Sequence, residues 1–411
     1  MKITAVDLFE IRIPYRRNHT LSSGPLHGAN SVVVRISTDE GLIGAGEASI
    51  PGGPGWSEES ASSVRMVIQE YLAPALMGRD PRNCSEIAVS MQRAVRGNPF
   101  ARAALEMACF DIAGQAFDVP AAQLMGGRQR QSVPMVWSLA SGNVDQEIEE
   151  AQKVNEQYGF TLFKVKVGYA KPLVDLSRVE GLTRGLPDDF EIRLDANQGW
   201  NEMTAAWMLP RLRDIGITVL EQPIPRWDLE GMSRLKRLGH VAIMADEAAM
   251  NSNDVINIIR SASADMIALK VAKAGGMLGT LQSAFIADAA GLPYYMGCMM
   301  DTGLGTSAYL QTASALRDMS YGAALPGPLM LSEDILTRSH HLQRRLCACP
   351  TRPWARCLRG LGKSGVTRKR GVMTARKRSV WSRIVSTVDL SGHYDWVDQF
   401  QGRSSSILFA G

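Results

Sequence analysis

The sequence predicts an α/β protein in which a (β/α)8-type barrel follows a smaller α+β domain. Three stretches carry this prediction: residues 190–198 (FEIRLDANQ), 217–223 (ITVLEQP) and 241–247 (VAIMADE). Each is a short apolar run typical of a buried parallel strand, and helical patterns separate the runs. Each run ends in a carboxylate, at intervals of 26 and 25 residues, about one strand, one helix and two loops. Such repeats close most economically into an eight-stranded barrel, whose chemistry sits at the C-terminal strand ends.

The carboxylates at the three strand ends are Asp195, Glu221 and Asp246. The C-terminal ends of neighbouring parallel strands meet at one face of a barrel, so we expect these side chains to converge. Carboxylate oxygens are hard ligands that suit Mg²⁺ or Mn²⁺. An acidic residue after a strand can also cap the next helix, but three of them in register favour a metal site.

Two strands that carry lysines flank the carboxylates. Residues 162–167 (LFKVKV) contain Lys164 and Lys166, which are two apart and therefore share one face of a strand. Residues 266–271 (MIALKV) contain Lys270, 24 residues after the last carboxylate. Lys166 and Lys270 thus lie on the first and fifth of five successive strands, which are opposite one another in an eight-stranded barrel. Because an inward-facing ammonium needs a counter-charge or a function, the sequence predicts one lysine on each side of a cavity.

Residues 1–125 do not follow the β/α repeat and predict the α+β domain. Alternating patterns predict antiparallel strands at 1–14, 31–38 and 42–48, and helical patterns follow at 57–76, 83–96 and 99–117. Two loops, residues 15–30 and 49–56, are suited to act as lids. His19 and His27 in the first loop are interpreted either as solvated loop histidines or as substrate contacts.

The barrel is predicted over residues 126–337. Its first strand is expected at 133–139, and its seventh and eighth strands are expected at 293–298 and 321–325. The Gly275–Gly276 pair after Lys270 would let the backbone approach the cavity closely.

The composition changes at residue 338. Residues 338–383 contain fourteen Lys or Arg and no Asp or Glu, whereas residues 1–337 contain 30 basic and 38 acidic residues, so the net charge of +4 comes from the tail. A basic arm for nucleic acid is one interpretation of residues 338–411, but the tail contains no recognisable binding motif. A solvated basic extension is a second interpretation. We favour a third, a frame slip in the coding sequence near residues 341–347.

The overall composition is that of a globular protein, 45% hydrophobic and 21% charged. A length of 411 residues suits a barrel with one added domain. There is no signal-peptide pattern and no apolar run long enough to span a membrane. The six cysteines form neither metal-spaced pairs nor a disulfide framework. We therefore expect a cytoplasmic protein that binds neither a membrane nor nucleic acid.

Several segments together resemble the enolase superfamily, in its muconate lactonizing enzyme (muconate/chloromuconate cycloisomerase) subgroup. They are K-V-K at 164–166, L-D-A-N at 194–197, E-Q-P at 221–223, A-D-E at 245–247 and L-K-V-A-K-A-G-G at 269–276. Further matching segments lie at 46–48, 104–106, 137–142 and 327–329. The resemblance implies that the α+β domain caps the strand ends, that Mn²⁺ or Mg²⁺ is the cofactor, and that the chain forms a homo-oligomer.

The resemblance also implies a reaction on a small dicarboxylate. One carboxylate of cis,cis-muconate adds to the conjugated double bond to form a lactone, and a metal-stabilised enolate forms at the other carboxylate. Lys166 would protonate the enolate, and Lys164 would supply a like positive charge beside Lys166. Lys270 would stabilise charge from across the cavity. Asn197 would contact the substrate, and Glu247 would orient a lysine.

Two positions suggest a departure from unsubstituted muconate. Muconate cycloisomerases carry a glutamate on the eighth strand where this chain has Ala324, and Pro51 in the lid loop would narrow specificity. A substituted muconate or another acid is therefore a candidate substrate. Two alternatives stay open: a racemase or epimerase of N-acylamino acids or dipeptides that uses Lys166 and Lys270 as a two-face acid/base pair, and a non-catalytic family member.

Overall fold

The computed structural model describes residues 1–336, 342–343, 346–348, 351 and 373–374. Its N-terminal part is a sheet made of β1 (Ile3–Leu21), β2 (Gly24–Thr38) and β3 (Ile43–Ser49), which are antiparallel, and of the short β14 (Met373–Thr374), which is parallel to β1. The expectation of a loop at residues 15–30 is wrong, because β1 and β2 continue through it as a hairpin. The run of polar residues between Tyr15 and Thr20 hides the strand alternation there.

Helix α4 (Pro99–Phe117) lies against this sheet and has the bounds that the sequence predicted. Gly44 and Gly46 of β3 permit the contact, because a Cβ on either would lie 2.1 or 2.0 Å from a carbonyl oxygen of α4. The other helical segments of this domain are η1 (Gly53–Gly55), α1 (Ala61–Val67), η2 (Ile68–Leu72), α2 (Ala73–Leu76) and α3 (Cys84–Ala94). Together the sheet and helices enclose a second core, which Ala272 and Met299 of the barrel also join.

Seven parallel strands then form one sheet in the order of the chain. They are β5 (Trp137–Leu139), β6 (Leu162–Lys166), β7 (Glu191–Asp195), β8 (Val219–Glu221), β9 (Ala242–Ala245), β10 (Met266–Leu269) and β11 (Tyr294–Met296). Ala323 forms parallel bridges to both Met135 and Met296, which closes the ring between the first and last strands. The predicted (β/α)8-type barrel is confirmed, with its eighth strand reduced to these bridges.

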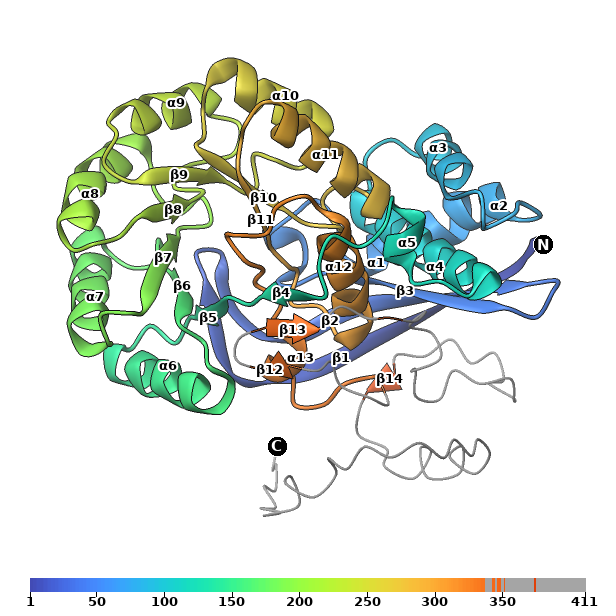
Figure 1. Cartoon of the computed structure of the whole chain (residues 1–411), viewed down its shortest axis with the longest axis horizontal. Helices are drawn as coiled ribbons and strands as arrows, with labels where there is room; N and C mark the ends of the chain where they lie inside the picture. The colour runs from blue at the N-terminus through green and yellow to red at the C-terminus, as the bar shows by residue number, and fades with distance from the viewer. Residues whose placement is uncertain (337–341, 344–345, 349–350, 352–372, 375–411) are drawn as a thin grey trace, which may run out of the picture. The chain divides into compact units, whose positions relative to one another are not determined.

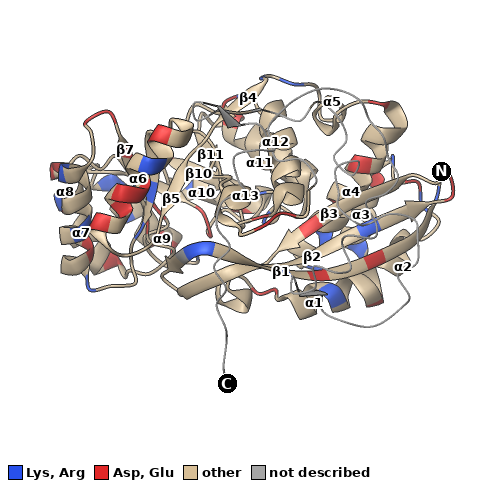
Figure 2. Ribbon diagram, turned by 90° about the horizontal axis from the view of Figure 1, so that it is seen from below, with Lys and Arg blue, Asp and Glu red and all other residues tan. Residues whose placement is uncertain are grey.

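Helices alternate with the strands and lie outside them, as Figure 1 shows for α6 to α10. They are α5 (Ala121–Leu124), α6 (Val144–Tyr158), α7 (Pro172–Gly185), α8 (Glu202–Asp214), α9 (Leu229–Arg237), α10 (Ser252–Ser261), α11 (Met277–Ala289), α12 (Gly303–Ala315) and α13 (Gly327–Met330). Both acidic and basic residues lie along helices α6 and α7 (Figure 2). Their apolar faces join the strands in a large core.

The predicted first strand, residues 133–139, is divided. Its first part is β4 (Ser132–Pro134), which pairs antiparallel with β13 (Leu346–Ala348), and β13 pairs with β12 (Leu342–Gln343). Cys347 is buried in the barrel core, so the fold extends beyond the expected boundary at 337. The frame slip stays a prediction, and most of the basic tail lies outside the described residues. None of the helices described here has both the length and the apolar character needed to cross a bilayer.

Candidate active site

The three predicted carboxylates lie where neighbouring barrel strands end. Asp195 is the last residue of β7, Glu221 is the last residue of β8, and Asp246 directly follows β9. The strand register places Asp195 beside both Lys166 of β6 and Glu221 of β8. All three carboxylates are 0% exposed. The parallel register thus gathers, at one end of the barrel, the acidic side chains that the strand spacing indicated.

The two lysines of β6 contact these carboxylates. Lys164 Nζ lies 3.0 Å from Glu221 Oε2 and 3.2 Å from Asp195 Oδ2, and Lys166 Nζ lies 2.6 Å from Asp195 Oδ2. Burial and the charge of Asp195 raise the pKa of Glu221 to about 7, although Lys164 opposes this shift. Burial acts to lower the pKa of Lys164, but Glu221 and other neighbours outweigh it, so that pKa is raised. Strand β6 therefore brings two amine groups to a cluster of buried negative charge.

Lys270 shares the third carboxylate with a lysine that the sequence reasoning missed. Lys270 Nζ lies 2.6 Å from Asp246 Oδ2, and Lys273 Nζ lies 2.6 Å from Asp246 Oδ1. Burial acts to raise the pKa of Asp246, but the two ammonium groups outweigh it and lower the pKa. A signal for Lys273 was present in the L-K-V-A-K run, where two lysines three residues apart leave the same strand end.

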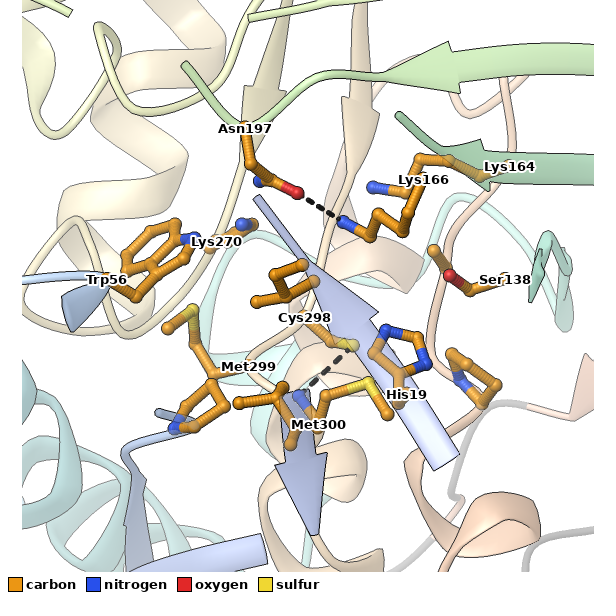
Figure 3. A pocket seen from close by; sticks show the side chains of 15 residues that line it. His19, Trp56, Ser138, Lys164, Lys166, Asn197, Lys270, Cys298, Met299 and Met300 are labelled. Atoms are coloured by element: carbon orange, nitrogen blue, oxygen red, sulfur yellow. Dashed lines mark hydrogen bonds between the residues drawn. The ribbon is translucent and has the colours of Figure 1, made fainter. Parts of the chain in front are cut away.

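Asn197 connects Lys166 to Glu247. Lys166 Nζ donates to Asn197 Oδ1 at 2.9 Å (Figure 3), and Asn197 Nδ2 donates to Glu247 Oε1 at 2.9 Å. Glu247 therefore reaches the lysine through the amide of Asn197 and not by direct contact, and its role in orienting that lysine stays a prediction. Burial and the charges of Asp246 and Asp195 raise the pKa of Glu247 to about 8. Glu247 Oε2 is buried and has no hydrogen-bond partner among the described residues.

The chemistry of this donor set suits a hard divalent cation. Three buried carboxylates on adjacent strands, with the spare oxygen of Glu247 nearby, are the ligands that Mg²⁺ and Mn²⁺ prefer. In the part of the chain that the structure describes, no group of three or more His, Cys, Asp or Glu side chains is placed to hold a metal ion. The carboxylate oxygens instead form ion pairs with lysine ammonium groups. A bound cation would compete with Lys164 for the oxygens of Asp195 and Glu221.

A pocket opens beside these groups (Figure 3). Lys164, Lys166 and Lys270 line it together with apolar side chains from the cap and the barrel. Pro51 and Ala324, the two positions that suggest a departure from unsubstituted muconate, also line this pocket. The lid segment, the eighth strand position and both lysine strands therefore face one cavity.

Two cap residues, one from each predicted lid segment, complete the walls of the site. The ring of Trp56 lies 4.4 Å from Lys270 Nζ, a distance typical of a cation–π contact. His19 is 1% exposed, and its Nδ1 has no hydrogen-bond partner among the described residues. Burial lowers the pKa of His19 well below its usual value, and the charge of Lys166 adds to the effect, so the ring is neutral. The interpretation as a solvated loop histidine is wrong for His19, whereas His27 is exposed.

Comparison with solved structures identifies proteins of the same fold. A muconate lactonizing enzyme from Pseudomonas fluorescens, solved with muconolactone, superimposes with a TM-score of 0.84 at 34% identity and covers 86% of this chain and 95% of its own. A 2-chloromuconate cycloisomerase from Rhodococcus opacus 1CP gives a TM-score of 0.84 at 32% identity, with coverage of 87% and 97%.

Sequence comparison gives the same relationship. A chloromuconate cycloisomerase of Cupriavidus necator is 38% identical over 333 residues, which is 81% of this chain and 90% of that protein. A muconate cycloisomerase of Acinetobacter lwoffii is 36% identical over 353 residues, or 86% and 92%. Residues 3–126 match the N-terminal domain model of mandelate racemase / muconate lactonizing enzymes, and residues 146–363 match the enolase C-terminal domain-like model. The chain belongs to the mandelate racemase / muconate lactonizing enzyme family of the enolase superfamily.

Proposed function

We propose that this protein is a metal-dependent cycloisomerase that converts cis,cis-muconate, or a substituted muconate, into a muconolactone. The observation that carries the proposal is the pocket in which Lys166 and Lys270 stand beside a row of three buried carboxylates. Relatives that match over most of their length are named for this reaction. A divalent cation, Mn²⁺ or Mg²⁺, held by these carboxylates would stabilise the negative charge that develops on a substrate carboxylate.

The pocket suits a small dianion with an apolar middle. Three lysine amines line it, and Leu21, Leu26 and Met299 add apolar surface. A dicarboxylate could place its charged ends near the amines and its diene carbons against the apolar side chains. Because the lysines are buried, their attraction for the carboxylates is stronger than it would be in water.

We assign proton transfer to Lys166. Its Nζ is held by Asp195 at 2.6 Å and by Asn197 at 2.9 Å, so the amine has a fixed position in the pocket. One substrate carboxylate oxygen forms the new C–O bond as the double-bond electrons move toward the other carboxylate. The carbon then takes a proton from Lys166, which regains one from water. Lys270 lies on the far side and stabilises the charge that develops.

Ala324 bears on the choice of substrate. It lines the pocket and is 3% exposed, at the position where the family resemblance led us to expect a glutamate. A methyl group there leaves room that a carboxylate would fill, and it removes a negative charge that would repel a dianion. We therefore propose that muconates with a substituent on a diene carbon, such as chloromuconates, are turned over with a higher kcat/KM than cis,cis-muconate.

Loss of diene absorbance tests the proposed reaction. Purified protein with Mn²⁺ and cis,cis-muconate or chloromuconates should lose this absorbance and form a lactone, and chelation of the metal should stop it. A parallel assay follows α-proton exchange in D₂O with N-succinyl amino acids and dipeptides. Exchange there without any lactone from muconates would overturn the proposal in favour of an epimerase, and inactivity in both assays would indicate a non-catalytic protein.

Replacing His19 with alanine is expected to raise the KM for muconate about tenfold or more, because a hydrogen bond to a charged group contributes about 1.5–3 kcal/mol. His19 lines the pocket, and its buried Nδ1, which has no hydrogen-bond partner among the described residues, could form a hydrogen bond with a substrate carboxylate. Since the pKa of His19 is lowered, the effect should stay constant between about pH 6 and pH 8.

The matched control is His27→Ala, on the same hairpin but exposed to solvent. Its KM should equal that of the wild type. An unchanged KM in His19→Ala would show that the substrate does not reach this part of the pocket.

A further inference from the structure

The cap domain also contacts the barrel at the loop that follows the second lysine strand. Glu106 of α4 is 1% exposed, and its Oε2 accepts a hydrogen bond from the N–H of Leu278 at 3.3 Å, in the first turn of α11. The N–H of Met277 also acts to lower the pKa of this carboxylate. Gly276, the N-cap residue of α11, has no side chain that could satisfy these groups. A barrel helix thus takes its N-terminal cap from the other domain.

The loop is shaped to receive this carboxylate. Gly275 and Gly276 have φ values of 73° and 139°, which favour glycine. A Cβ on Gly276 would lie 1.9 Å from Glu106 Oε2, so any larger residue would push the carboxylate away. Of the glycine pair that the sequence connects with close approach to the cavity, Gly276 therefore serves contact with Glu106, and Gly275 lies against the guanidinium of Arg102.

The same loop contains Lys273, and backbone hydrogen bonds join it to the segment that begins at Lys270. The N–H of Ala274 donates to the carbonyl of Lys270 at 3.2 Å, and the N–H of Gly276 donates to the carbonyl of Val271 at 3.0 Å. The segment from Lys270 to Gly276 is therefore one hydrogen-bonded turn. Because Lys270 and Lys273 both reach Asp246 from this turn, a shift at the start of α11 would move both amines.

A second glutamate of the cap repeats the arrangement one helix later. Glu47 of β3 is 1% exposed and accepts hydrogen bonds from Thr302 Oγ1 at 2.6 Å and from the N–H of Gly305 at 2.9 Å, at the start of α12. The residues just before this point, Met299 and Met300, line the pocket. Carboxylates of the cap thus hold two successive barrel helices at the loops that form the site.

We propose that Glu106 is a positioning residue for Lys270 and Lys273, through which the docked cap sets the placement of these amines in the active site. The proposal rests on the proposed function in so far as Lys270 acts in turnover. Burial raises the pKa of Glu106 to about 8, against the effect of the backbone N–H groups and Arg102. Its role as an acceptor is one that the amide oxygen of glutamine can share.

Glu106→Ala is expected to lower kcat between about tenfold and a hundredfold, because a small misplacement of a catalytic group has effects of this size. The KM should change less, because Lys270 acts mainly on charge that develops during the reaction. Glu106→Gln should restore most of the lost kcat. Glu106→Asp, one methylene shorter, should behave like Glu106→Ala and serves the same test if the alanine variant does not fold.

The matched control is Asp111→Ala, with Asp111→Asn as its conservative partner. Asp111 is a buried carboxylate on the same helix that accepts the N–H of Ala45 inside the cap. Its removal should lower the unfolding temperature but leave kcat unchanged. A purely structural role for Glu106 would give this same pattern, so wild-type kcat in the Glu106 variants would overturn the proposal.

Amide hydrogen exchange provides a readout that does not need turnover. Glu106→Ala should speed exchange in residues 270–276 as well as in the first turn of α11, whereas Asp111→Ala should not. Should the wild type fail to convert any muconate, the proposed function falls while this exchange pattern still decides the role of Glu106. Faster exchange confined to residues 277–279 would show a helix cap that does not position the lysines.

Discussion

Substitution of Lys166 by methionine is expected to lower kcat by about 10²- to 10⁴-fold, the range that general acid–base groups contribute. Methionine preserves most of the length and apolar volume of the side chain but carries no proton to transfer. The backbone and β6 should be unaffected, because Asp195 keeps its contact with Lys164 at 3.2 Å. The measurement is the rate of diene loss at saturating muconate and Mn²⁺, together with the unfolding temperature.

The matched control is Lys153→Met, on the exposed face of α6. It removes one positive charge from the surface and should leave both kcat and KM unchanged. If Lys166→Met were to retain kcat within about threefold of the wild type, the proton would have to come from another group. Lys270 and Lys164 would then be examined by the same substitution.

The sequence predicted the barrel and the row of carboxylates because both follow from a repeating local pattern. A strand that ends in an acid, repeated every 25 or 26 residues, places Asp195, Glu221 and Asp246 side by side once the strands are parallel and in register. The two-residue spacing of Lys164 and Lys166 placed both amines on the inner face in the same way. No knowledge of distant contacts was needed for these predictions.

The parts that the sequence did not predict depend on contacts between distant segments. The pattern predicts a loop at His19 because the charged residues before it interrupt the alternation, although backbone pairing with β2 keeps the segment extended. Trp56 and Glu106 belong to the cap, and nothing in their local pattern shows that they meet Lys270 and Leu278 more than 170 residues later. Lys273 is not predicted by the strand pattern, because it lies in the loop three residues after Lys270, beyond the end of β10.

Substitution of Glu221 by glutamine is expected to abolish most metal-dependent turnover, with a loss of about 10²-fold or more, since even indirect contacts to a metal are worth 10- to 100-fold. The amide has nearly the same shape but removes one negative charge and one anionic oxygen from a buried set of three. A cation bound only to the folded protein raises its unfolding temperature. Mn²⁺ should therefore raise the unfolding temperature of the wild type clearly and that of Glu221→Gln only slightly.

The metal-free proteins should also differ in how stability depends on pH. The pKa of Glu221 in the folded protein, about 7, lies above its ordinary value of 4.5, so the folded state holds this proton more tightly than the unfolded state. The folded wild type should therefore lose stability as pH rises from about 4.5 to about 7, and the glutamine variant should lack this part of the slope.

Glu230→Gln, on the exposed end of α9, should behave as the wild type in both tests. An equal Mn²⁺ shift in wild type and Glu221→Gln would mean that the ion binds elsewhere, since a carboxylate that ligates a cation cannot be neutralised without weakening its binding.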